Sequence, residues 1–233
     1  LIAFATPMVS AGYFPISAQT VRSRQTEADR LLREGIQQID AQNPQAALQS
    51  FQKALTIYRT LQYLFGEAWS LNNLGRAYDA LSQYDRAISS YQQSLIIFRK
   101  LQNRYGEAWS LNNSGRAYDA LGQYDRAISS YQQSLVIFQE LQNRYGEAWV
   151  LNNLGRTYDA IGQHDRAVSF HQQSLVIFQE LQDRYGEAWA LNNSGRAYDV
   201  LGQHDRAISS YQQSLVIFQE LQDRYGEAWA LNN

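Results

Sequence analysis

The chain has 233 residues, with 20 basic and 22 acidic side chains and a formal net charge of −2. This balance gives no reason to expect a nucleic acid as partner, because binding to a phosphate backbone requires a basic face. The sequence contains no cysteine, which excludes disulfides, thiolate metal sites and cysteine nucleophiles. Its apolar content of 45% is sufficient for a continuous core.

The first 18 residues are apolar, uncharged and unlike the remainder of the chain. Two prolines and a length below the roughly twenty residues of a membrane span argue against stable membrane insertion. The segment is typical of the end of a secretory signal, with cleavage after Ala18, and a membrane anchor or a disordered leader are the alternatives. A signal would make the protein extracytoplasmic or secreted; otherwise we expect it to be cytoplasmic. Residues 19–26 are expected to form a linker.

A forty-residue unit repeats almost verbatim through the rest of the chain, and residues 107–146 and 187–226 differ at only four of forty positions. A repeat of this period is the signature of a solenoid, in which each unit stacks on its neighbour. We expect the array to occupy 27–233, with units at 27–66, 67–106, 107–146, 147–186 and 187–226 and a partial unit at 227–233. Because 227–233 stops within a helix, we expect the chain to be a fragment that exposes apolar side chains there, which makes self-association through this end an option.

Each unit is predicted to contain two helices, the first beginning at Glu67 or its equivalents and the second ending at about Leu101. The apolar positions of the first helix recur with helical spacing, as do those of the second: Leu71, Leu74, Gly75, Tyr78 and Leu81, then Ala87, Ile88, Tyr91, Leu95 and Phe98. Glycines after the first helix suit a left-handed C-terminal position, and Asp85 or its equivalents could cap the second helix: Gly122, Gly162 and Gly202.

Four glycines inside the first helices each cost about 1 kcal/mol relative to alanine: Gly75, Gly115, Gly155 and Gly195. We attribute them to close approach of the partner helix.

The pattern L-x-x-[LS]-G-x-x-Y from Leu71 to Tyr78 is followed by a second set of fixed positions: Tyr84, Ala87, Tyr91, Ser94 and Leu95. This arrangement resembles the tetratricopeptide repeat over residues 27–233. The forty-residue unit, longer than the usual thirty-four, is similar to the variety found in kinesin light chains. The resemblance implies an all-α, right-handed α–α superhelix of antiparallel helix pairs. Near-identical units behind a signal-like leader also resemble bacterial proteins that carry a C-terminal caspase-like CHAT domain, no part of which occurs here.

The face of the first helix opposite the core carries polar and aromatic side chains, and Trp69, Asn72 and Arg76 lie within about 60° of one another. The resemblance implies that this face lines a concave groove and that Asn73 and its equivalents bond to the main chain of a ligand. The predicted site comprises Trp69, Asn72, Asn73, Arg76, Trp109, Asn112, Asn113, Arg116, Trp149, Asn152, Asn153, Arg156, Trp189, Asn192, Asn193 and Arg196.

Two structural alternatives stay open for this face. Trp69 could pack under the preceding second helix, and Arg76 could pair with Asp79 three residues later on the same helix. The histidines carry no catalytic pattern, because His164, His204 and His171 replace tyrosines of other units. No unit combines a nucleophile, a base and an orienting group, and neither a cofactor nor a metal is expected.

The sequence therefore predicts a non-enzymatic scaffold for protein–protein interaction that binds a peptide or a partner domain in its groove. The alternative is a regulatory or sensor arm of a larger protein whose catalytic CHAT domain is absent from this sequence.

Overall fold

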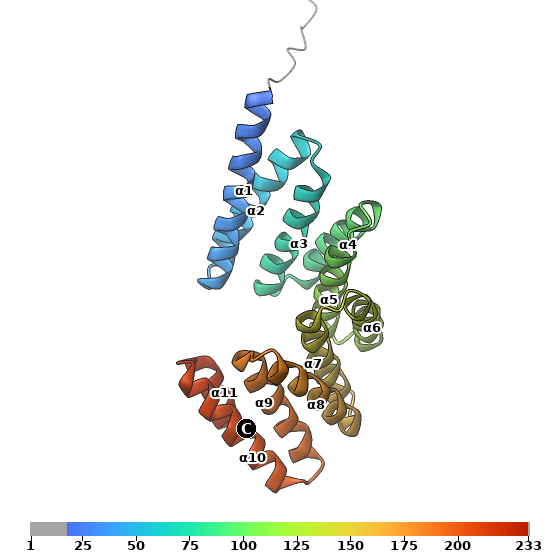
Figure 1. The fold of residues 1–233 in the computed structure, drawn as a ribbon, viewed down its shortest axis with the longest axis vertical. Coiled ribbons are helices and arrows are strands. Elements are labelled where there is room, and N and C mark those ends of the chain that lie inside the picture. The colour runs from blue at the N-terminus through green and yellow to red at the C-terminus, as the bar shows by residue number, and fades with distance from the viewer. Residues whose placement is uncertain (1–17, 233) are drawn as a thin grey trace, which may run out of the picture.

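The computed structural model describes residues 18–232, and within this range every element is a helix. Three-residue turns join the helices, and each helix packs against the next along a curved path (Figure 1). The helices are α1 (Ala18–Asp40), α2 (Pro44–Thr60), α3 (Leu64–Ala80), α4 (Tyr84–Lys100), α5 (Arg104–Ala120), α6 (Tyr124–Glu140), α7 (Arg144–Ala160), α8 (His164–Glu180), α9 (Arg184–Val200), α10 (His204–Glu220) and α11 (Arg224–Asn232).

The expected all-α superhelix of stacked helix pairs is confirmed. Residues 19–26, expected to form a linker, lie inside α1, which is 23 residues long. The predicted leader falls almost entirely on residues 1–17, outside the described residues. None of the helices within 18–232 combines the length and apolarity that crossing a bilayer requires.

The predicted start of the first helices at Glu67 and its equivalents is wrong by three residues. Asn103 caps α5, and its side-chain oxygen accepts from the backbone N–H of Gly106 at 2.7 Å, so the helix already includes residues 104–106. Asp85 is likewise not a cap: Gln83 occupies that position, and Asp85 lies in the first turn of α4. There its negative charge still interacts favourably with the positive N-terminal end of the helix dipole.

Every turn places its second residue in the left-handed region. After the first helices this residue includes the predicted glycines, with φ of 71° at Gly122 and 77° at Gly162. After the second helices it is always glutamine, with φ of 54° at Gln102 and 52° at Gln142. The glycine turns could be predicted from the sequence because glycine adopts this conformation without strain. The glutamine turns could not be predicted in this way.

The predicted close approach at the helix glycines is confirmed, and the partner is an aromatic ring. A Cβ atom at Gly115 would lie 2.6 Å from Cε1 of Tyr131, a side chain of α6 that is 1% exposed. The helices thus pack closely because the glycine leaves room for the ring of the following helix.

The consequence for function is a division of the array into two layers. Helices α3, α5 and α7 lie on the inner side of the curve in Figure 1, whereas α4, α6 and α8 lie on its outer side. Side chains on the inner helices therefore face a common concave surface.

Candidate functional site

A groove of about 970 Å³ runs along the inner helices, and its lining residues come from α1, α3, α5, α7, α9 and α11 alone. Every predicted site residue except Asn192 lines it. Asn192 is 2% exposed and lies below the surface. The lining also includes residues that were not predicted: Asp40, Tyr105, Tyr145, Tyr185, Tyr225 and Trp229.

The tryptophans combine the two roles left open by the sequence. Trp69 lines the groove, yet its ring also packs edge-on against Phe98 of α4, with centroids 5.0 Å apart. This partner belongs to the following helix, whereas the packing alternative had placed the tryptophan under the preceding one. The indole N–H groups of Trp109 and Trp149 are buried and meet no acceptor among residues 18–232. At these two positions the face of the indole ring is therefore what the tryptophan can offer to a ligand.

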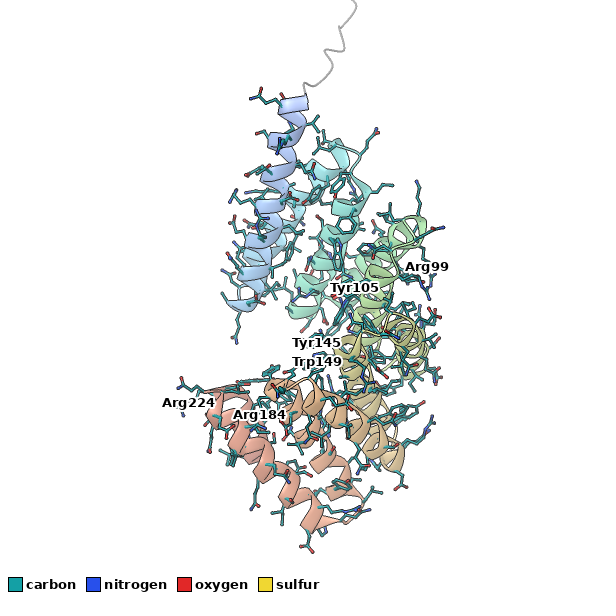
Figure 2. All side chains as sticks on the ribbon, in the orientation of Figure 1. Arg99, Tyr105, Tyr145, Trp149, Arg184 and Arg224 are labelled. Carbon is teal, nitrogen blue, oxygen red and sulfur yellow. The ribbon has the colours of Figure 1, made fainter. Side chains whose placement is uncertain are left out.

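Tyrosines that the sequence analysis missed join the tryptophans into one continuous row. Tyr105 lies 6.1 Å from Trp69 and 6.2 Å from Trp109, measured between ring centroids. Figure 2 shows Tyr105, Tyr145 and Trp149 on the inner side of the curve, with Arg99 on the outer side. The aromatic track is defined as Trp69, Tyr105, Trp109, Tyr145, Trp149, Tyr185, Trp189, Tyr225 and Trp229.

The tyrosines could have been found from the sequence, because one stands four residues before every tryptophan except Trp69, a spacing that puts both rings on one helix face. This spacing was overlooked because the first helices were expected to begin at Glu107, which would leave Tyr105 in a turn.

The asparagines form hydrogen bonds between neighbouring units along the groove floor. Asn113 donates through Nδ2 to Oδ1 of Asn72 at 3.2 Å, and Asn153 donates to Asn112 at 3.0 Å. These side chains are between 2% and 7% exposed. They therefore connect one unit to the next, a role that the sequence analysis did not foresee. Each donating amide keeps a second N–H.

Arginines of the groove pair with aspartates of the preceding unit, so the alternative in which Arg76 pairs with Asp79 is not what the structure shows. Arg116 lies 3.1 Å from the carboxylate of Asp79, and Arg196 lies 2.8 Å from that of Asp159. Burial raises the pKa of Asp79 above its ordinary value, and the nearby Arg116 opposes this shift. These ion pairs are a second set of contacts between units.

Two groove arginines are less engaged than the others. Arg76 donates to Asn73 and has no carboxylate within 4.0 Å among the described residues, because the position that would carry its partner holds Ile39. Arg156 lies 3.9 Å from Asp119, whose other oxygen accepts from the hydroxyl of Thr157 at 2.7 Å. Arg76 and Arg156 therefore keep most of their donors available.

The three histidines differ in burial: His171 is packed in the core, His164 is partly buried, and His204 is exposed. His171 is fully buried against Gly155, with Nδ1 donating to Oδ1 of Asn152 at 2.8 Å. His164 lies against Asp159. Over the part of the chain that the structure describes, no three His, Asp or Glu side chains gather as metal ligands would.

The fold is similar to several solved structures. BtubC (BKLC) from P. vanneervenii superposes with a TM-score of 0.67 at 21% identity, covering 89% of this chain and 93% of that one. A putative kinesin light chain from Podosopora anserina with nearly identical TPR-like repeats gives 0.63 at 24%, covering 87% and 96%. A Rap protein in complex with Competence and Sporulation Factor gives 0.79 at 15%, covering 90% and 60%. The chain thus spans about three fifths of the Rap protein.

The similarity to these solved structures concerns the fold alone, whereas the comparison with protein families identifies a family. No curated protein matches the sequence. The family model described as tetratricopeptide repeat matches four overlapping segments, 31–100, 66–140, 106–180 and 148–220, which together cover most of the chain. The chain belongs to the tetratricopeptide repeat family.

Proposed function

We propose that this protein is a non-catalytic scaffold that binds an extended segment of a partner protein in the groove of its inner helices. The observation that carries the proposal is the aromatic track, an unbroken row of rings along a groove of about 970 Å³. Exposed aromatic rings beside arginines are typical of surfaces that bind proteins.

The polar residues of the groove support an extended ligand. Arg76 and Arg156 can donate to carboxylates or carbonyl groups of a peptide. The remaining N–H groups of Asn113 and Asn153 lie on the groove floor, where they can reach a peptide carbonyl. Because these residues recur in each unit, a ligand with a repeated or extended form would meet the same contacts several times. The Rap protein, whose fold is similar, was solved as a complex with a factor, which is consistent with binding by such arrays.

The alternative, a regulatory arm of a larger protein with a CHAT domain, stays a prediction that no observation here favours over the scaffold.

The test uses peptides selected from a random twelve-residue display library against the purified chain. All five tryptophans of the protein line the groove, so intrinsic tryptophan fluorescence reports its occupancy. We expect the selected peptides to shift this fluorescence and to lose at least about tenfold in affinity for the variant Arg76→Ala/Arg156→Ala. The matched control is Gln132→Ala/Gln212→Ala on the exposed side of α6 and α10. Peptides that bind the groove variant normally but not the control variant would show that the binding surface is the convex side.

A further inference from the structure

The aromatic track has a regular geometry. Within a helix, the ring centroids of a tyrosine and the next tryptophan are 6.2–6.4 Å apart and their planes differ by 67–73°. Between helices, a tryptophan and the next tyrosine are 6.1–6.4 Å apart with planes differing by 45–49°. The track therefore offers ring faces at one repeated distance in two alternating orientations.

The rings are both exposed and held in place. Tyr105, Tyr145 and Tyr185 are 45–49% exposed. Four of the five tryptophans, all except Trp229, rest edge-on against a phenylalanine of the following helix at 5.0–5.3 Å, and these phenylalanines are fully buried. A ligand would thus meet flat apolar surfaces on side chains that are already ordered, so binding would lose little further side-chain entropy.

Most acceptors on the groove floor are already engaged, whereas the arginines offer donors. The tyrosine hydroxyls of the track can both donate and accept, and the exposed carboxylate of Asp40 lies at one end of the groove. The amide oxygens of Asn72, Asn112 and Asn152 already accept from asparagines of the next unit. The carboxylates of Asp79, Asp119 and Asp159 are only 12%, 17% and 7% exposed and face arginines. The arginines, by contrast, are 40–48% exposed and can only donate.

We propose that the segment bound on the aromatic track is proline-rich and adopts the polyproline II conformation. This inference rests on the proposed function and names the chemistry of its partner. Proline rings pack on the faces of tyrosine and tryptophan, and aromatic-lined grooves are a recurring way to bind such segments. A polyproline II helix advances roughly 3.1 Å per residue, so about two residues span one step of the track.

The excess of donors is the argument against an ordinary extended peptide. Such a peptide presents a backbone N–H at each residue, and those that face the groove floor would find few free acceptors besides the tyrosine hydroxyls of the track. A buried donor without a partner weakens binding. Proline has no N–H, and its carbonyl group accepts from arginine and asparagine. A proline-rich segment therefore fits both the rings and the donors.

The experiment measures the binding of three ten-residue peptides by intrinsic tryptophan fluorescence: decaproline, a glycine–serine peptide, and an alternating glutamate–serine peptide. We expect decaproline to bind at least about tenfold more tightly than either of the others. The variant Tyr105→Ala/Tyr145→Ala/Tyr185→Ala should weaken decaproline binding about tenfold or more, because three exposed ring faces are lost. The variant with phenylalanine at the same three positions should stay within about threefold of the wild type, because it keeps the ring faces.

Tyr124→Ala is the matched control, because Tyr124 lies at the start of α6 and away from the track. This variant should bind decaproline with the affinity of the wild type. Circular dichroism of each variant separates loss of binding from loss of fold. If the glutamate–serine peptide binds as tightly as decaproline or more tightly, the proposal of a proline-rich ligand is wrong, although the groove remains the binding site. If the library-selected peptides bind without any effect from the groove variants, the proposed function fails as well.

Discussion

At the scale of the residue, two glycines in each of α3, α5, α7 and α9 decide how closely the neighbouring helices approach. In α5, Gly106 lies against Phe98 of the preceding helix and Gly115 lies against Tyr131 of the following one. Both rings are almost completely buried, so they cannot turn away from an added side chain. The propensity cost of each glycine, about 1 kcal/mol, is therefore offset by packing on both sides of the helix.

Gly115→Ala should lower the free energy of unfolding by about 1 kcal/mol. The added methyl group would approach Tyr131 to 2.6 Å, and overpacking of this kind costs about 1–3 kcal/mol, which exceeds the gain in helix propensity. Gly115→Leu should be more damaging. Urea denaturation measures the change, and the same substitution made in a Tyr131→Ala background should cost nothing further. If Gly115→Ala is as stable as the wild type, the ring of Tyr131 moves to make room for the added methyl group.

His171 provides a residue-scale prediction about pH. Burial lowers its pKa to about 3, Arg196 and Arg156 add to the shift, and Asp159 opposes it. The folded protein therefore keeps His171 neutral, whereas the unfolded chain binds a proton at about pH 6.5. Because the unfolded state binds more protons below that pH, stability is fully present above about pH 6.5 and falls as the pH drops toward 3.

Replacing His171 with tyrosine, the residue of the equivalent positions 91 and 131, should remove this dependence. Between pH 7.5 and pH 5 the wild type should lose about 2 kcal/mol more than the variant His171→Tyr. Urea denaturation at the two pH values gives the difference, and the other titrating groups are common to both proteins. Equal losses in wild type and variant would mean that His171 takes up a proton in the folded state.

At the scale of the element, the sequence predicted the number and pairing of the helices but displaced the start of the first helix. Apolar spacing marks the middle of a helix reliably, because burial repeats with the helical period. It says little about the first turn, where Asn103 and its bond to Gly106 decide the boundary. Because the predicted helix start was too late by three residues, Tyr105 and its equivalents were not recognised as part of the groove.

The contacts between units could not be predicted for a different reason. Arg116 meets Asp79 of another unit, 37 residues earlier, and not Asp119 on its own helix. Spacing along one helix predicts which side chains share a face, whereas the pairing of faces depends on how the helices stack. The predicted site residues other than Asn192 line the groove, while their hydrogen-bond partners were not foreseen.

The cap of α7 allows a test of this element-scale account. Asn143 accepts from the backbone N–H of Gly146 at 2.8 Å, and Asn143→Ala should lower the free energy of unfolding by about 1 kcal/mol. Asn143→Asp should leave it nearly unchanged, since Asp183 makes the same bond to Gly186 at the start of α9. Thermal unfolding of the two variants distinguishes them. An equal loss in both would assign the effect to the turn and not to the cap.

At the scale of the whole molecule, the array behaves as a chain of units joined only to their neighbours, and its stability depends on the interfaces between them. Asn152 lies at one such interface. Its Oδ1 atom accepts from Nδ2 of Asn193 in the next unit at 3.2 Å and from Nδ1 of His171 in its own unit at 2.8 Å. The side chain is 3% exposed, so no bulk water can replace it.

Asn152→Ala should therefore weaken the coupling between the unit at 147–186 and the part of the array from α9 onward. It leaves two buried donors without an acceptor, at about 1–3 kcal/mol each. The loss at Asn193 falls on the interface between the units, whereas the loss at His171 falls within the unit of Asn152. We expect urea denaturation to show a smaller m-value or two separate transitions, because the segments no longer unfold together. Gly115→Ala is the control, since its collision with Tyr131 lies within one unit: it should shift the midpoint and keep a single transition. If Asn152→Ala also keeps one transition with the wild-type m-value, the buried asparagines do not couple the units, and apolar packing together with the ion pairs between units carries the cooperativity of the array.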